Sequence, residues 1–553
     1  MKIKPPAAAR QFPAIDRRTL FKSGLLGAGL AALPQAVAAG TIAGFAYGVA
    51  SGEPGPDTIL LWTRYSSGQD TALRWELASD INFTAIVDGG DVVARPEHDF
   101  CVKPVATGLK PDTHYYYRFT APDGTMSDVG RTRTLPAGKV DKFRMAVFSC
   151  SNMGFGYFNA YAHAAEQNAF DLLVHVGDYF YEYQAGNYPS AAQALPDRNL
   201  SPHTEVIALA DYRLRHATYR GDPDLRRLTQ LYPMIMGWDD HESANDSYRD
   251  GAQNHQSDSE GEWAVRKAAA MRAYREWLPV SDAPYAAYEV GDLATLFRLE
   301  TRLLGRDEPP SIGDVLKGKT NADEAMAALV AFRDGAYQDP TRSILGMKQE
   351  AWLSGALKTS TANGTKWQVL VQQVVMGELA GSPELLEGMS ADVPAWLQQR
   401  LMAAAAAARA GLPLNMDAWD GYPAARSRLL TAAQEADANL VVLAGDSHNG
   451  WAFELENDGA AAGVEFAGHS VSSPGFETNV GWINPADLAR TSVEANSELV
   501  WADTSQRGYM AVDLTPEKAT SEYRFVENVR KRSSKLAGTH RITARHGARK
   551  FDA

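Results

Sequence analysis

Leu172-Leu173-Val174-His175-Val176-Gly177-Asp178-Tyr179-Phe180-Tyr181 is the stretch that decides the fold. It predicts a short buried strand that ends in a glycine and then presents an aspartate and a tyrosine. Three other apolar runs end similarly, in Ser149-Cys150-Ser151-Asn152, Trp238-Asp239-Asp240-His241-Glu242 and Gly445-Asp446-Ser447-His448-Asn449. Ligands of open α/β sheets gather beyond the carboxyl ends of the strands, so we expect these polar groups to meet in one crevice.

The segments between the apolar runs are long enough to be helices. Strands separated by helix-sized segments favour a layered α/β domain after about residue 138. The predicted strands are Phe143–Ser149, Leu172–Val176, Met234–Gly237, Trp367–Val375 and Leu440–Ala444, and the predicted helices are Asn159–Asn168, Glu262–Trp277, Asp323–Arg333 and Ala395–Ala410.

Residues 41–138 have the pattern of a small all-β domain. Short alternating runs at Ile59–Tyr65, Leu73–Leu77 and Tyr115–Thr120 are separated by glycine, proline and aspartate turns. The stretch Leu109-Lys110-Pro111-Asp112-Thr113-His114-Tyr115 resembles the tyrosine corner of fibronectin type III and immunoglobulin-like sandwiches. Its tyrosines are therefore expected to be structural.

The first 38 residues have the pattern of an export signal. A basic start that contains Arg17 and Arg18 is followed by an apolar run, Gly24–Leu33, and by the small residues Ala36-Val37-Ala38. The paired arginines resemble the bacterial twin-arginine signal, which implies the twin-arginine export machinery as a partner and a periplasmic or secreted protein. The alternative, an anchor helix, is disfavoured because the run is well short of the ~20 residues that span a bilayer.

Composition narrows the function classes. The chain has 553 residues, 45% of them hydrophobic, and a net charge of −13. Such an acidic protein repels nucleic acid and anionic lipid, so neither is a default partner. Only Cys101 and Cys150 are present, which excludes a disulfide-rich scaffold, and we expect no disulfide between them because Cys150 is a candidate thiolate.

The strand-end groups point to cations. Acidic and imidazole side chains converging on one crevice repel each other unless cations neutralise them. A thiolate, a phenolate and carboxylates suit Fe³⁺, and carboxylate and amide oxygens suit Ca²⁺. Two such metals together can stabilise both oxygens of an in-line displacement at phosphorus.

The order of these motifs resembles the calcineurin-like metallophosphatases and, more closely, the alkaline phosphatase D family. The matching stretches run from about residue 42 to about 530 and include Phe45–Gly52, Gly177–Tyr181, Trp238–Glu242, Asp417–Tyr422, Gly445–His448 and Ser472–Gly475. The resemblance implies a layered metallophosphatase-type β-sandwich flanked by helices over residues 139–530. The small all-β fibronectin/Ig-like domain precedes it, and a basic tail of residues 531–553 follows it.

The resemblance also implies a role for each site residue. Iron would be bound by the Cys150 thiolate and the Tyr181 phenolate, and Asp178 would bridge iron and calcium. His241 would be the general acid or transition-state donor. Further metal ligands would be Asp240, Asn245, Asp446, His448 and, for another calcium, Asp420, while Asn152, Tyr179 and Arg302 would contact phosphate.

The implied activity is hydrolysis of phosphate monoesters or diesters by a metal-bound hydroxide, with one iron and one or two calcium ions as cofactors. Alternatives are a phosphodiesterase or phospholipase D-type hydrolase of the same family, a serine hydrolase that uses Ser447, an exported redox enzyme, and a non-enzymatic surface-binding protein. The insertion at about 282–360 and the basic tail, with Arg530-Lys531-Arg532 and Arg541–Lys550, are expected to form walls of the site, to bind anionic substrate, or to be a solvated tail.

Overall fold

The computed structural model describes residues 44–381, 386, 389, 393 and 395–552. The predicted export signal at residues 1–38 lies outside the described residues. Within these described ranges, no helix combines the length and the hydropathy needed to cross a lipid bilayer.

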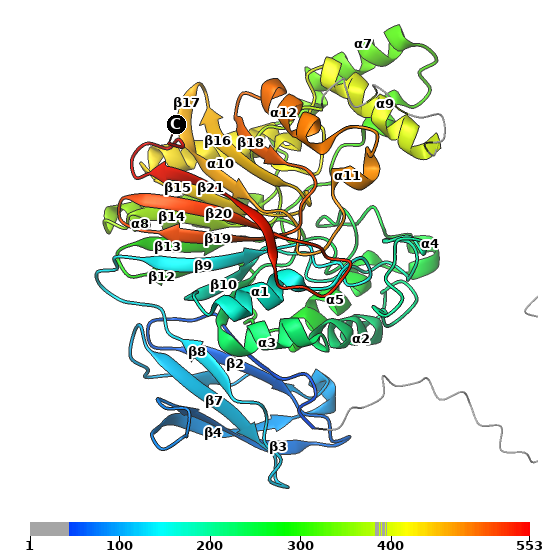
Figure 1. The fold of residues 1–553 in the computed structure, drawn as a ribbon. Coiled ribbons are helices and arrows are strands. Elements are labelled where there is room, and N and C mark those ends of the chain that lie inside the picture. Colours follow the sequence, from blue (N-terminus) through cyan, green and yellow to red (C-terminus); the bar gives the residue numbers. More distant parts are fainter. Residues whose placement is uncertain (1–43, 382–385, 387–388, 390–392, 394, 553) are drawn as a thin grey trace, which may run out of the picture. The chain divides into compact units, whose positions relative to one another are not determined.

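A ten-stranded sheet runs through the described chain (Figure 1). Its centre is formed by three parallel strands, β9 (Phe143–Phe148), β10 (Leu172–His175) and β11 (Pro233–Met236). They are buried along their length except for the half-buried Arg144 in β9, as parallel strands covered on both faces are. The remaining strands are β19 (Gly508–Leu514), β20 (Lys518–Val526) and β21 (Leu536–Arg545) on one side, and β1 (Val49–Gly52), β2 (Ile59–Arg64), β5 (Cys101–Val102) and β6 (Val105–Ala106) on the other.

A seven-stranded sheet packs against the first one. Its strands are β12 (Ala286–Val290), β13 (Ala294–Arg298), β14 (Trp367–Val371), β15 (Leu440–Ala444), β16 (Gly450–Asn457), β17 (Ala460–Ala467) and β18 (Leu499–Asp503). β13, β14, β15 and β17 are parallel. One apolar cluster joins the two sheets, because it contains Val147 and Val174 of the first and Leu296, Val369 and Val441 of the second.

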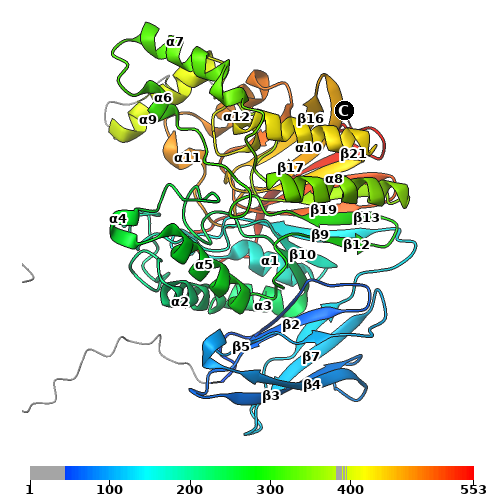
Figure 2. The ribbon, with the colours of Figure 1, turned by 180° about the vertical axis from the view of Figure 1, so that it is seen from behind.

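Helices cover the outer face of each sheet, as Figures 1 and 2 show. α1 (Asn159–Gln167), α2 (Leu209–Arg220), α3 (Pro223–Leu231) and α5 (Trp263–Trp277) share an apolar cluster with the ten-stranded sheet. α8 (Gly346–Ala362) and α10 (Pro423–Glu435) do so with the seven-stranded sheet. The other helices are α4 (Ser257–Glu260), α6 (Ile312–Leu316), α7 (Ala322–Arg333), α9 (Ala395–Arg409), α11 (Phe476–Asn479) and α12 (Pro485–Ala495). The predicted layered α/β sandwich is confirmed.

The first hundred described residues contain the third sheet, which has four strands in the order β4 (Ile86–Ala94), β3 (Thr71–Ala78), β7 (His114–Thr120) and β8 (Gly130–Arg133). The Tyr115 hydroxyl accepts a hydrogen bond from the Lys110 N–H at 2.9 Å, which is the geometry of a tyrosine corner. The other strands of this region do not form a separate sheet, because β1, β2, β5 and β6 belong to the ten-stranded sheet. β1 pairs in parallel with β11, so the predicted boundary near residue 138 does not interrupt the large sheet.

Two other segments differ from their predictions. Residues 286–298 are not part of an insertion, because they form the β12–β13 hairpin at one edge of the seven-stranded sheet. The basic segment after residue 530 is not a free tail, because Leu536–Arg545 forms the edge strand β21. β12 alternates exposed and buried residues, and β21 is mostly exposed or half-buried, so neither has the apolar run that identified the central strands.

Candidate active site

The carboxyl ends of parallel strands from both sheets meet at one place, where the loops pack too closely for ordinary side chains. A Cβ on Gly445, after β15, would lie 2.5 Å from the Ser149 Cβ, after β9. A Cβ on Gly177, whose φ is +108°, would lie 2.8 Å from the Asp239 backbone nitrogen. Glycine at these two positions therefore allows the loops that carry the predicted site to converge.

Among the described residues, three sets of side chains have ligand atoms within 4.8 Å of one another. Asp178 belongs to the first two sets, and Asp240 belongs to the last two. The sets are Cys150, Asp178 and His448; Asp178, Asp240 and His241; and Asp239, Asp240 and Asp446. The structure thus brings together six of the predicted site residues, and Asp178 is shared by two of the sets.

Tyr181 completes the first set. Its hydroxyl oxygen lies 3.0 Å from Asp178 Oδ2 and 3.0 Å from His448 Nε2. His448 Nδ1 lies 2.8 Å from the Pro474 carbonyl oxygen, which can only accept, so this nitrogen carries the ring proton and Nε2 is free to act as a ligand. The predicted thiol, phenol, carboxyl and imidazole groups therefore converge on one point.

Burial determines the protonation of this set. Desolvation, reinforced by the negative charge of Asp178, raises the pKa of the Cys150 thiol and of the Tyr181 phenol well above their ordinary values. Desolvation also raises the pKa of Asp178. A bound cation would reverse these effects, because it favours the charged form of each ligand.

A further observation indicates that the carboxylate oxygens of the site suit a bound cation. Asp178 Oδ1 and Asp239 Oδ2 are buried, and neither has a hydrogen-bond partner among the described residues. A buried carboxylate oxygen without a partner costs free energy, and metal coordination removes that cost. The residues present therefore fit the metal-dependent chemistry that the sequence predicts.

His241 forms a buried pair with Glu182. Its Nδ1 lies 2.7 Å from Glu182 Oε2, and the other carboxylate oxygen accepts from the Asn245 N–H at 2.8 Å and from Asn254 Nδ2 at 2.7 Å. Burial alone would lower the pKa of His241, but Asp240, Asp178 and Glu182 together raise it well above its ordinary value. His241 is thus held in one orientation, and its raised pKa favours the protonated ring.

Arg302 neutralises the third set of carboxylates. Its guanidinium hydrogen-bonds Asp239, Asp417 and Asp446, and it lies 3.8 Å from Asp240. The side chain is completely buried. The prediction that Arg302 faces phosphate differs from this arrangement, in which all its nearest charges are carboxylates of the protein.

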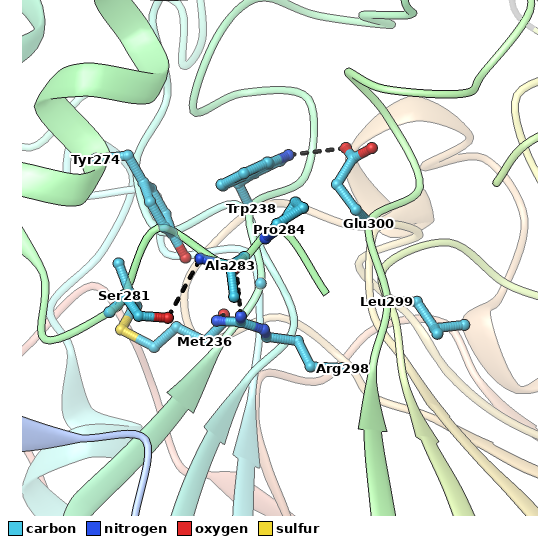
Figure 3. Close-up of a pocket in the computed structure, with 11 residues that line it drawn as sticks. Met236, Trp238, Tyr274, Ser281, Ala283, Pro284, Arg298, Leu299 and Glu300 are labelled. Carbon is cyan, nitrogen blue, oxygen red and sulfur yellow. Dashed lines mark hydrogen bonds between the residues drawn. The ribbon is translucent and has the colours of Figure 1, made fainter. Parts of the chain in front are cut away.

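Trp238 and Glu300 join the loop that carries Asp239 to the loop that carries Arg302. The Trp238 indole N–H donates to Glu300 Oε1 at 2.9 Å (Figure 3). The same carboxylate accepts the N–H groups of Arg302, Leu303 and Leu304. The cavity behind Trp238 has a volume of about 10 Å³, room for one water molecule at most. It is too small for a phosphate ester.

The other predicted site residues lie outside the three sets of candidate ligands. Asn152 is buried, with Oδ1 accepting from the Phe155 N–H at 3.1 Å and Nδ2 without a partner in the described chain. Asn245 is half-buried, and its Nδ2 donates to Gln253. Tyr179 is a core residue of the helix-covered face. Asp420 belongs to none of the three sets; its Oδ2 accepts from the Leu379 N–H at 2.9 Å, and its Oδ1 is buried with no hydrogen-bond partner among the described residues.

Four residues that position the site were not predicted: Glu182, Glu242, Asp417 and Ser473. The Glu242 carboxylate accepts the N–H groups of Asp178, Tyr179 and Asp239, and so connects the loops after β10 and β11. Three of the four lie inside the quoted motifs and Glu182 directly follows Tyr181, so proximity to a motif was the only available signal.

Two alternatives can be compared with the geometry. The Ser447 hydroxyl accepts from the Trp451 indole at 2.8 Å and makes no described hydrogen bond with a histidine, so it has no general base there. Cys101 and Cys150 are both free thiols, as expected.

Comparisons with known proteins identify the family of the chain. The model of a family described as "PhoD-like phosphatase" matches residues 145–523, and that of "PhoD-like phosphatase, N-terminal domain" matches residues 32–136. Alkaline phosphatase D of Bacillus subtilis (strain 168) is 33% identical over 511 residues, which cover 87% of this chain and 77% of that protein. A solved structure of PhoD aligns with a TM-score of 0.74 and 29% identity over 92% of both chains. The chain belongs to the PhoD-like phosphatase family.

Proposed function

We propose that this metal-dependent phosphoesterase holds Fe³⁺ with Cys150, Asp178, Tyr181 and His448, and Ca²⁺ with Asp178, Asp240 and Asn245. The single observation that carries the proposal is the position of Asp178, which two sets of candidate ligands share and whose Oδ1 has no partner in the described chain. A thiol and a phenol suit Fe³⁺, whereas the second set offers carboxylate oxygens that suit Ca²⁺. Asp420 lies outside these sets, and its buried Oδ1, which has no partner in the described chain, keeps it as the proposed ligand of a further Ca²⁺.

Bound cations would supply Lewis acidity, offsetting the negative charge of the phosphoryl oxygens and lowering the pKa of water. The chain itself supplies a proton donor. Glu182 holds His241 by its Nδ1, so Nε2 is the atom that donates a proton to the leaving oxygen. Arg302 keeps Asp239, Asp240 and Asp446 in place without itself contacting substrate.

The substrates would be small phosphate esters, and either monoesters or diesters are compatible with this ligand set. We also propose export to the periplasm or medium through the twin-arginine machinery, on the basis of Arg17, Arg18 and the small residues up to Ala38. Replacing both arginines with lysine should leave the precursor in the cytoplasm, as detected by cell fractionation.

The decisive experiment combines metal analysis with activity on matched substrates. The natively exported protein should contain about one iron per chain together with calcium, and it should hydrolyse nitrophenyl phosphate until a chelator removes the metals. The ratio of monoester to diester hydrolysis then identifies the substrate class. A folded protein whose activity is indifferent to chelator would contradict the proposal.

A further inference from the structure

The loop from Ser472 to Gly475, which follows β17, contacts three of the four proposed iron ligands. Ser473 Oγ lies 2.6 Å from the Tyr181 hydroxyl and 2.8 Å from the Cys150 carbonyl. The next residue, Pro474, accepts the His448 Nδ1 proton through its carbonyl at 2.8 Å. Ser473 is completely buried, so water does not compete for these hydrogen bonds.

The Ser473 hydroxyl has one proton and two acceptors within reach. The Cys150 carbonyl already accepts the Ser473 backbone N–H at 3.2 Å and that of Ser472 at 3.4 Å. The Tyr181 oxygen has Asp178 and His448 as the acceptors for its own proton, and Ser473 is the neighbour that can donate to it. We therefore assign the Ser473 hydroxyl proton to the hydrogen bond with the Tyr181 oxygen.

We propose that Ser473 is a positioning residue that donates a hydrogen bond to the phenolic oxygen of Tyr181 and thereby favours its binding to a trivalent cation. This inference rests on the proposed function, because it takes Tyr181 as an iron ligand. A donor on the outer side of a ligand oxygen fixes its orientation and stabilises its anionic form, as such partners do at other metal sites. Iron would replace the phenolic proton between Asp178 and His448.

The test compares Ser473→Ala with two matched serine variants. Ser470→Ala removes a hydroxyl from the same loop, where it donates to the Ser473 carbonyl at 2.6 Å without contacting Tyr181. Ser521→Ala removes a buried hydroxyl that has no hydrogen-bond partner among the described residues. Each metal-free full-length protein is titrated with Fe³⁺ against a competing chelator while visible absorption is recorded.

An Fe³⁺–phenolate pair absorbs visible light by transfer of an electron from the phenolate. Loss of the hydrogen bond raises the energy of that electron, so Ser473→Ala should move the band to longer wavelength. It should also weaken Fe³⁺ binding by about 10- to 100-fold. Both control variants should keep the wild-type band and affinity.

The results that would contradict this inference differ from the result that would contradict the proposed function. An unchanged band in Ser473→Ala, or the same shift in Ser470→Ala, would overturn the role of Ser473. If the wild-type protein gives no phenolate band with Fe³⁺, the inference fails even when the isolated protein hydrolyses phosphate esters. If the band depends on Ser473 but no ester is hydrolysed, the proposed function fails and the inference stands.

Discussion

Arg302 is a single residue on which the charge balance of the site depends. Its buried guanidinium lies between Asp239, Asp417 and Asp446. Without Arg302, Asp417 keeps its ion pair with Arg306, but Asp239 and Asp446 lose their arginine partner. Removing one partner of a buried ion pair costs about 3–5 kcal/mol. We therefore expect Arg302→Ala to lower the free energy of unfolding by that amount, measured by urea denaturation at neutral pH.

Arg490 on α12 is a suitable control, because its ion pair with Glu494 is exposed on both sides. Such pairs contribute little to stability, so Arg490→Ala should leave the urea midpoint unchanged. If both variants behave alike, Arg302 is not the counter-charge that its contacts indicate.

His216 on α2 gives the protein a specific sensitivity to acid. Burial, together with the nearby Arg220, lowers the pKa of His216 from 6.5 to about 3. The unfolded chain binds a proton near pH 6.5 and the native chain does not. The stability that His216 contributes is therefore complete above pH 6.5 and is lost as the pH falls toward 3.

Between pH 7 and pH 5 this histidine accounts for a loss of about 2 kcal/mol in the free energy of unfolding. Its ring packs edge-on against Phe180 with centroids 4.8 Å apart, and neither ring nitrogen has a described hydrogen-bond partner. His216→Phe is therefore a reasonable replacement. Urea denaturation at pH 7 and pH 5 should show that the variant loses about 2 kcal/mol less of its free energy of unfolding between these pH values than the wild-type protein does. An identical pH dependence in the two proteins would contradict the prediction.

At the scale of elements, the carboxyl-terminal segment before β21 holds the loop that carries Cys150. Arg530 hydrogen-bonds the carbonyls of Phe155 and Gln193, and its guanidinium stacks on the Phe155 ring at 4.8 Å. The Tyr157 N–H donates to the Val529 carbonyl at 2.7 Å. Arg530 thus acts on the protein's own loop, in contrast to the predicted contact of the basic residues with substrate.

Arg530→Ala should accordingly speed hydrogen–deuterium exchange in the peptides that cover residues 150–158. Arg541 is the matched control, since it lies on β21 and forms its ion pair with Glu522 on β20. Arg541→Ala should leave exchange in those peptides unchanged. Equal exchange in Arg530→Ala and the wild-type protein would show that the segment does not hold the loop.

The strands that could be predicted from the sequence are those that consist of a continuous apolar run, and four helices were predicted as well. The five central strands are apolar runs, and α1, α5, α7 and α9 begin and end within one residue of their predicted bounds. Strands such as β12 and β21 lie at sheet edges, where one face meets water and no apolar run is needed. Six of the predicted site residues converge in the three sets, whereas Glu182 and Asp417 lie in irregular loops whose partners only the tertiary structure determines.

At the scale of the whole molecule, the amino-terminal strands and the two large sheets are joined by direct contacts. All the described residues from 44 onward belong to one compact unit. β1 is hydrogen-bonded to β11, and a shared apolar cluster contains Trp62 of β2 and Trp277 of α5. The Trp62 indole donates to the Glu276 carbonyl at 2.8 Å, and Arg298 pairs with Glu53 at 2.7 Å.

Removing residues 44–136 would therefore expose the edge of β11 and leave Arg298 buried without its carboxylate. We expect the chain from residue 139 onward to be insoluble or unfolded when produced alone. The mature protein should unfold in a single transition, followed in parallel by far-ultraviolet circular dichroism and tryptophan fluorescence. Two separate transitions, or a soluble and active fragment, would show that the amino-terminal sheet is an independent domain and that the continuous sheet does not couple it to the site.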